Sequence, residues 1–191
     1  MIELLNIADL ALSDGAVRLR PYRPDDVDVL FAAARESIEE VNPWLPWCHV
    51  KYSRDEAAAW VHSRAEAWRT GTEYSFVIED EATQQFAGGC ALNQIDPLRL
   101  RANLGYWVRS SMTGRGLATV ATRLLARFGF EKLGLQRIET VAAVGNIASQ
   151  RVAEKAGAMR ECIARRRLRV HGRPHDAVCY SFIADDLFSI T

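Results

Sequence analysis

The residues with the clearest chemical use lie in Met112–Thr119, where two glycines precede an apolar pattern of helical spacing. The first turn of a helix has backbone N–H groups without intrahelical partners and carries a partial positive charge. Gly114 and Gly116 lack the Cβ atoms that would hold a bulky anion away from these groups, and Ala118 keeps the next turn narrow. The segment therefore predicts a backbone site for an anion such as a pyrophosphate.

Two other phosphate-binding motifs fit this segment poorly. A P-loop requires GxxxxGK[ST], and no Lys-Ser or Lys-Thr pair follows these glycines. A dinucleotide fingerprint requires GxGxxG or GxGxxA in a parallel βαβ unit, whereas Gly114-Arg115-Gly116 is followed by Thr119, and the strands before it are predicted to be antiparallel. For the glycines taken alone, a glycine-rich helix start without a ligand stays open as the alternative.

A strand before this segment and a helix after it must position the glycines. Arg101–Val108 alternates like a strand, and apolar residues recur at helical spacing from Gly116 to Phe128, with Gly129 and Gly134 near the helix end. Short connections to the two preceding strands predict antiparallel pairing. The other predicted elements are strand Val17–Arg20, a helix from Pro24, a helix from Ser53 to Thr70, strands Tyr74–Glu79 and Phe86–Gln94, strand Arg137–Val144, helix Ala148–Ala156 and two strands within Met159–Ile183.

Length and composition limit the class of protein. The chain of 191 residues has no internal repeat or linker, which predicts a single α/β domain of the α+β type over residues 1–191. Its 24 basic and 24 acidic residues cancel, so neither nucleic acid nor an anionic membrane is an expected partner.

The same sequence bears on location and metal binding. There is no apolar run of about 18 residues, and Met1–Leu12 has no pattern of a secretory signal. Cys48, Cys90, Cys162 and Cys179 form no metal-binding motif, and we expect them to be reduced thiols in the core. A cytoplasmic protein without a metal site is therefore predicted.

Several more motifs occur in the order typical of one family. They are Pro-Trp-Leu-Pro-Trp at 43–47, Gly-Tyr-Trp-Val at 105–108, Thr-Gly-Arg-Gly-Leu-Ala-Thr at 113–119, Arg-Ile-Glu at 137–139, the stretch 146–157, Gly172, and His175-Asp176. With these motifs nearly the whole chain resembles the GNAT superfamily of acetyl-CoA-dependent N-acetyltransferases. Within it, the chain is most similar to the branch of ribosomal-protein N-terminal acetyltransferases called RimJ and RimL. The resemblance implies acetyl-CoA as the co-substrate.

The resemblance also implies a fold and a set of contacts to the co-substrate. The fold would be a splayed, mixed but mostly antiparallel sheet of about seven strands flanked by about four helices. A β-bulge at Trp107 and Val108 would let the backbone pair with the pantetheine arm, which Asn146 would also contact. The residues implied to bind the phosphates are Thr113, Gly114, Arg115, Gly116, Leu117, Ala118, Thr119 and Arg151. For the two arginines, a solvated side chain is the alternative.

Acetyl transfer from a thioester to an amine needs a neutral amine, a polarised carbonyl and a proton for the leaving thiolate. Many GNAT members supply that proton from a tyrosine, and Ala153 occupies its position here. Ser149 matches the serine that has this role in the RimL-like branch and lies near the thiol there, so we expect Ser149 to be the catalytic acid. The alternative is that Ser149 only caps the helix that begins there.

The sequence has no direct counterpart of the general base that the resemblance implies. The glutamate that RimL-like enzymes place on the penultimate strand corresponds to Leu168. A water relay is one replacement. Glu40, Asp96 and Asp176 are carboxylates that could lie near the cleft, and a structural role is the alternative for each of them.

The acceptor amine is expected to enter opposite the co-substrate, over the loop of Trp44 and Trp47 and past Asn93. Two tryptophans in one loop are also typical of a packed lid, so both interpretations stay open. In the run Arg165–Arg169 the odd-numbered arginines would share one face of a strand. They would either attract an acidic peptide or protect an exposed sheet edge.

Two functional hypotheses follow. The first is an enzyme that acetylates a primary amine, above all the N-terminal α-amine of a protein or peptide, by direct attack in a ternary complex. The second is a catalytically weak GNAT-fold module that binds and senses acyl-CoA, because Ala153 and Leu168 replace expected catalytic groups. The sequence does not identify the acceptor. The resemblance to the RimJ and RimL branch is compatible with a homodimer.

Overall fold

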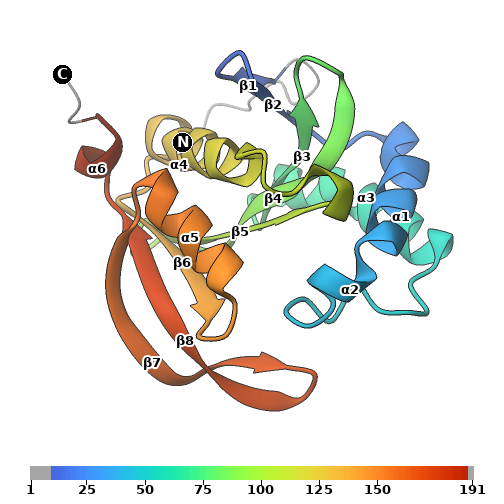
Figure 1. Ribbon diagram of the computed structural model, residues 1–191. Helices are drawn as coiled ribbons and strands as arrows, with labels where there is room; N and C mark the ends of the chain where they lie inside the picture. Colours follow the sequence, from blue (N-terminus) through green and yellow to red (C-terminus); the bar gives the residue numbers. More distant parts are fainter. Residues whose placement is uncertain (1–9, 189–191) are drawn as a thin grey trace.

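The computed structural model describes residues 10–188. The described chain forms one eight-stranded sheet with strand order β1-β2-β3-β4-β5-β6-β8-β7 (Figure 1). The strands are β1 Leu12–Ser13, β2 Val17–Pro21, β3 Tyr74–Asp80, β4 Gln85–Asp96, β5 Arg101–Val108, β6 Arg137–Ala143, β7 Met159–Val170 and β8 Arg173–Phe182. The helices are α1 Val27–Glu36, α2 Ile38–Val41, α3 Arg54–Thr70, α4 Leu117–Leu133, α5 Ile147–Ala156 and α6 Ala184–Phe188, with short 3-10 turns η2 Pro24–Asp26 and η3 Ser110–Met112. Most of Met1–Leu12, for which no secretory signal was predicted, lies outside the described residues.

The sheet opens between β5 and β6. These two strands are parallel, and their pairing joins Arg101–Asn103 only to Arg137–Glu139. Beyond that point they diverge, so the backbone edge of Leu104–Val108 on this side has no paired strand within residues 10–188. All other neighbouring strands are antiparallel. The predicted mixed, mostly antiparallel, splayed sheet is confirmed, with eight strands where about seven were expected.

Helices cover both faces of the sheet because neighbouring strand residues point to opposite sides. On one face, Leu125 and Phe128 of α4 pack in a cluster with Phe76. On the other face, Leu30 of α1 and Val61 of α3 pack in a second cluster with Val77, the next residue of the same strand. The opening between β5 and β6 thus lies between two rigid layers, with α4 and α5 on one side and α1–α3 on the other (Figure 1).

Local sequence signals explain where the long helices begin and end. Ser53 Oγ accepts a hydrogen bond from the Glu56 N–H at 3.2 Å, and the Glu56 carboxylate accepts from the Ser53 N–H at 2.9 Å. This is the capping box predicted for α3. Helix α4 ends at Gly134, whose φ of 65° is left-handed and therefore favours glycine.

Several expectations need correction. Helix α1 is preceded by the 3-10 turn at Pro24, and the short elements β1, α2 and α6 were not predicted. The pairing of β4 with β5 runs in register to Val108, and its irregularity lies between Asn93 and Asp96, so the bulge expected at Trp107 and Val108 is not found there.

The arginine-rich strand and the cysteines also differ from expectation. A register shift between Ala164 and Leu168 places three residues of β7 opposite Asp176, and Arg166 has a φ of 51°. The expected strict alternation of the odd-numbered arginines is therefore wrong. Cys48 and Cys90 are buried as predicted, whereas Cys162 is exposed and Cys179 is only partly buried.

Candidate functional site

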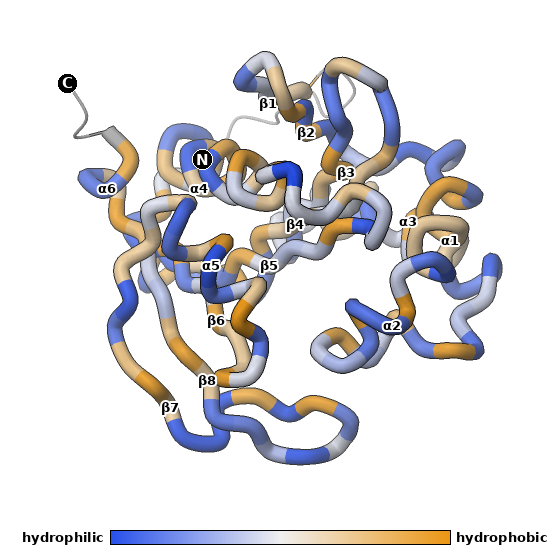
Figure 2. The backbone as a smooth tube through the Cα atoms, in the orientation of Figure 1, coloured by the Kyte–Doolittle hydropathy of each residue, from blue (hydrophilic) through white to orange (hydrophobic). Residues whose placement is uncertain are grey.

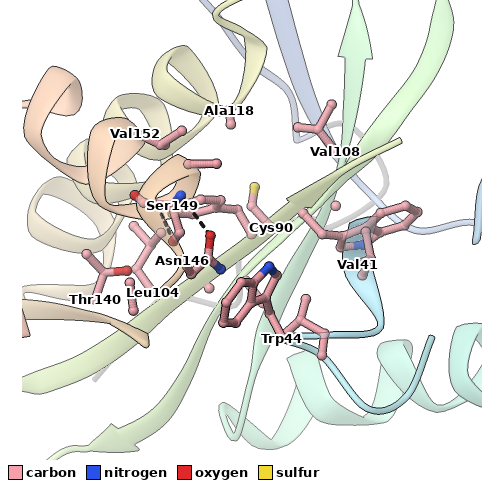
Figure 3. Close-up of a pocket in the computed structure, with 18 of the residues that line it drawn as sticks. Val41, Trp44, Cys90, Leu104, Val108, Ala118, Thr140, Asn146, Ser149 and Val152 are labelled. Atoms are coloured by element: carbon pink, nitrogen blue, oxygen red, sulfur yellow. Dashed lines mark hydrogen bonds between the residues drawn. The ribbon is translucent and has the colours of Figure 1, made fainter. Parts of the chain in front are cut away.

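A cavity of about 1110 Å³ occupies the opening between β5 and β6, and part of its lining is drawn in Figure 3. It extends from the start of α4, past β5 and α5, to the loop that follows α2. The predicted site residues that line it are Trp44, Trp47, Asn93, Trp107, Val108, Thr113, Gly114, Gly116, Leu117, Ala118, Thr119, Asn146, Ser149 and Arg151. The fold therefore brings the predicted co-substrate and acceptor residues to the same cavity.

The loop before α4 presents backbone N–H groups to the cavity. Gly114 and Gly116 have φ values of 76° and 79°, and a Cβ at either position would meet no atom within 4 Å, so backbone conformation rather than crowding explains these glycines. No acceptor within residues 10–188 takes the N–H groups of Gly116, Leu117 or Ala118. The Thr119 N–H already donates to Gly116 O at 3.0 Å. The free N–H groups and the positive end of the helix fit a phosphate anion.

Helix α1 holds this loop in place. Glu36 pairs with the Arg109 guanidinium and accepts from the Ser111 N–H at 2.7 Å. The hydrogen bond from Arg109 is the main cause that lowers the pKa of Glu36 to about 2. Ser37 Oγ accepts from the Ser110 N–H at 3.0 Å. Charged and polar side chains from α1 therefore position the segment that carries the free N–H groups.

The two arginines predicted near the phosphates have different surroundings. The Arg115 guanidinium forms an ion pair with Asp80 of β3, and Arg115 does not line the cavity. Arg151 lines the cavity, is exposed and has no ion pair within the described residues. Of the two side chains, only Arg151 is thus available to a ligand without breaking an existing pair.

Asn146 and Ser149 lie side by side at the start of α5 (Figure 3). The Asn146 side chain accepts from the Ser149 N–H at 3.1 Å, so Asn146 is the N-cap of the helix. The interpretation that Ser149 caps this helix is therefore wrong. Its hydroxyl lies in the third residue of the helix and faces the cavity.

Tyr106 of β5 is the site residue that the sequence did not reveal. Its hydroxyl donates to Ser149 O at 2.8 Å and lies 3.0 Å from Ser149 Oγ. Burial raises the pKa of Tyr106 to about 12, against the opposing effect of the hydrogen bond to Ser149. The phenol that is missing at Ala153 is thus present on a different element. Its signal in the sequence was the alternation of β5, which turns Tyr106 to the face opposite Trp107.

The far wall of the cavity is aromatic. The Trp47 ring packs edge-on against Trp107 and Tyr52, with centroids 5.3 and 5.5 Å away. Trp44 lines the same wall and reaches Gly145, where a Cβ would lie 3.2 Å from the Trp44 ring. The loop is therefore both packed and part of the cavity surface, so the two interpretations of its tryptophans are compatible.

Polar groups of the sheet complete this side of the cavity. Asn93 Oδ1 accepts from Asn103 Nδ2 at 2.9 Å across β4 and β5, and both side chains line the cavity. Tyr22 lines it as well, and its hydroxyl is buried without a hydrogen-bond partner among the described residues. A Cβ on Gly89 would lie 2.4 Å from the Tyr22 hydroxyl, so only glycine leaves room for it.

The carboxylates proposed as the base separate into two groups. Glu40 lines the cavity and accepts from Ser110 Oγ at 2.5 Å. Asp96 pairs with Arg99 in the β4–β5 turn, and Asp176 accepts from the Arg166 N–H at 2.8 Å. Neither Asp96 nor Asp176 lines the cavity. Leu168 does line it, so the position of the branch's glutamate is apolar here.

The chain is similar to known proteins in both sequence and structure. The model of the acetyltransferase (GNAT) domain matches residues 16–159. Bacillus subtilis YdaF, whose name describes a candidate ribosomal N-acetyltransferase, is 30% identical over 171 residues, which cover 87% of this chain and 91% of YdaF. The chain belongs to the GNAT acetyltransferase family.

Solved structures agree with this assignment. Mycobacterium smegmatis RimJ in complex with CoA-disulfide has a TM-score of 0.84 at 27% identity, covering 94% of this chain and 88% of the RimJ chain. RimL, the ribosomal L7/L12 alpha-N-protein acetyltransferase, in complex with coenzyme A has the same fold, with a TM-score of 0.84 at 21% identity and coverages of 93% and 99%. This GNAT acetyltransferase is therefore an acetyl-CoA-dependent N-acyltransferase, and acetyl-CoA is its co-substrate.

Two negative findings concern residues 10–188 alone. No helix there is long and apolar enough to cross a membrane. In the same range, no group of three or more His, Cys, Asp and Glu side chains could hold a metal ion.

Proposed function

We propose that this acetyltransferase moves the acetyl group of acetyl-CoA to the N-terminal α-amine of a protein, by direct attack in a ternary complex. The observation that carries the proposal is the continuity of the cavity, which joins the start of α4 to the aromatic loop after α2. Both co-substrates can occupy such a cavity together, and holding an amine next to a thioester supplies much of the rate by proximity alone.

The binding of acetyl-CoA is assigned mainly to the backbone. In this proposal the free N–H groups within Gly114–Ala118, with Thr113 and Thr119 beside them, hold the pyrophosphate, and Arg151 supports the adenosine phosphates. The unpaired edge of β5 at Trp107 and Val108 receives the pantetheine arm like an added strand. The Asn146 oxygen is used by the helix cap, which leaves its NH₂ group to contact the arm.

Proton transfer is assigned to Ser149 and Tyr106. Ser149 Oγ gives its proton to the leaving thiolate, and water returns a proton to Ser149 afterwards. The Tyr106 hydroxyl, which donates to Ser149 O in the structure, turns its single O–H toward Ser149 Oγ, 3.0 Å away, and stabilises the charge that develops there. The acceptor amine approaches from the wall of Trp44, Trp47 and Asn93. Its proton leaves through water toward Glu40, the one of the three proposed base carboxylates that lines the cavity.

The names of YdaF and of the RimL structure, which both mention the ribosome, support a ribosomal protein as the acceptor. A cytoplasmic location belongs to the same proposal, as does a homodimer of the RimJ/RimL type. The residues of the cavity do not themselves encode one peptide sequence.

The test is a steady-state assay of free-thiol release with peptides that carry free N-termini, matched peptides with blocked N-termini, and small amines. Turnover with free N-termini alone supports the proposal. A second function, an acyl-CoA sensor with little turnover, is favoured by the apolar Leu168 in the cavity lining. Calorimetric titration with acetyl-CoA separates the two, because tight binding without turnover on any amine would support the sensor.

A further inference from the structure

The hairpin of β7 and β8 carries a strong local charge in a chain whose net charge is zero. Between residues 165 and 176 there are five arginines and one carboxylate, Asp176. All five arginines, Arg165, Arg166, Arg167, Arg169 and Arg173, are exposed, and none forms an ion pair within residues 10–188. Figure 2 shows this hairpin as hydrophilic stretches that alternate with short hydrophobic ones. The arginines therefore carry uncompensated positive charge.

The bulge in β7 turns part of this charge toward the cavity. The Asp176 carboxylate accepts from the Arg166 N–H at 2.8 Å, which holds the irregular backbone at this point. After the bulge, Arg167 and Arg169 line the cavity together with Leu168. A bulge commonly redirects side chains in this way. A basic strand that only protected a sheet edge would not need to place its arginines at a cavity wall.

The hairpin also lies beside the proposed acceptor entrance. Its turn contacts the segment after α2, because His171 Nε2 lies 2.7 Å from Asn42 O. Trp44, two residues further along, lines the same cavity. A polypeptide whose N-terminus lies in the cavity would thus leave it next to these arginines.

We propose that the five hairpin arginines form a docking surface for an acidic segment of the acceptor protein, downstream of the acetylated residue. The inference rests on the proposed function, since it concerns the acceptor of the same reaction. An acidic polypeptide fits better than RNA, because the whole chain has no net positive charge and the arginines lie beside the cavity that receives a polypeptide N-terminus in the proposed function. Docking of this kind raises the rate of encounter and weakens with salt.

The experiment compares two peptides with the same first residues and a free N-terminus. One continues with Asp and Glu, and the other with Ser and Gly. At low salt the acidic peptide should have a kcat/KM higher by about tenfold, and this advantage should largely vanish at about 0.5 M salt, where charges beyond a few ångströms are screened.

The variant is Arg165→Gln with Arg166→Gln and Arg173→Gln, three exposed positions outside the cavity lining. Because Arg167 and Arg169 remain, its ratio of kcat/KM for the acidic and neutral peptides should fall from about tenfold to about two- to threefold, while the neutral peptide reacts as with the unchanged protein. The matched control, Arg69→Gln with Arg99→Gln and Lys132→Gln, removes the same charge from other exposed sites and should keep the ratio. Equal rates for both peptides with the unchanged protein would overturn the proposal.

Direct binding keeps the test independent of turnover. Fluorescence anisotropy of an acidic peptide labelled at its C-terminus should show binding that is several-fold weaker in the hairpin variant and unchanged in the control, even if no amine is acetylated. Loss of turnover on every amine would refute the proposed function but not this docking. A single-stranded RNA of similar length that displaces the acidic peptide and binds more tightly would assign the surface to RNA instead.

Discussion

Removal of the Tyr106 hydroxyl separates a catalytic role of the Tyr106–Ser149 pair from a structural one. Tyr106→Phe keeps the ring between β5 and α5 but deletes the donor to Ser149 O at 2.8 Å and the contact to Ser149 Oγ at 3.0 Å. One such hydrogen bond contributes about 1 kcal/mol net, up to about 1.5 kcal/mol. If that contribution orients Ser149 in the transition state, kcat should fall roughly five- to tenfold, since 1.36 kcal/mol corresponds to a factor of about ten.

Ser149→Ala should be more severe, because it removes the proposed donor itself. A loss of about 10²–10⁴-fold in kcat is expected from the usual contribution of a general acid. Because the two hydroxyls act through the same proton, the double variant should be no slower than Ser149→Ala alone. Calorimetry should find acetyl-CoA affinity nearly unchanged in all three variants.

Tyr180→Phe is the matched control. The Tyr180 hydroxyl donates to Glu154 at 2.9 Å and does not line the cavity. Its loss should lower the free energy of unfolding by a similar amount and leave kcat intact. Because burial raises the pKa of Tyr106 to about 12, its hydroxyl stays protonated, and the rate should show no alkaline loss from this group below about pH 11. Full activity of Tyr106→Phe, or additive losses of kcat in the double variant, would refute a joint catalytic role of Tyr106 and Ser149.

Three further predictions concern the co-substrate site and stability. Gly116→Ala should weaken coenzyme A binding in calorimetry. Gly134 has the same kind of positive φ at the other end of α4, so Gly134→Ala should only lower the melting temperature. Equal coenzyme A affinities of the two variants would contradict the backbone anion site. Tyr22→Phe should raise the free energy of unfolding by about 1 kcal/mol in urea titrations, since it removes a buried hydroxyl without a partner; a loss of stability would show that the hydroxyl is satisfied. Glu36, whose pKa is lowered to about 2 mainly by Arg109, stabilises the fold above its ordinary pKa of 4.5, and this contribution disappears as pH falls toward 2. Glu36→Gln should therefore be less stable than the unchanged protein at neutral pH, and the difference should close on acidification.

Features that depend on neighbouring residues could be predicted from the sequence. The strand Arg101–Val108 agrees in both bounds, because alternation and short turns define it locally. The capping box at Ser53 and the glycines of the loop before α4 also follow from a few adjacent residues. The predicted residues Trp107, Val108 and Thr113, which line the cavity, belong to this strand and to the loop after it, so a local pattern was enough to single them out.

Features that join distant segments could not be predicted. Tyr106 and Ser149 are 43 residues apart, and only the parallel pairing of β5 with β6 brings them together. No glycine in the sequence marks the bulge in β7. Arg166 adopts the positive φ there, and Asp176 of the next strand accepts a hydrogen bond from its N–H. Simple alternation therefore does not hold across Arg165–Arg167.

Ala153 and Leu168 replace expected catalytic groups, but the geometry of the site makes them a weaker argument against catalysis than the sequence alone did. In the proposed function, co-substrate binding depends on backbone N–H groups and a strand edge, which the side chains at Ala153 and Leu168 do not provide. Ala153 is a buried residue of α5, so a tyrosine there would have to be accommodated by the core, while Tyr106 already places a phenol beside Ser149. Leu168 lines the cavity, and because successive strand residues point to opposite faces, its side chain lies away from those of Arg167 and Arg169. The absence of a carboxylate at this position therefore removes a candidate base without changing the charge of the arginines, and the proposed docking surface does not depend on it.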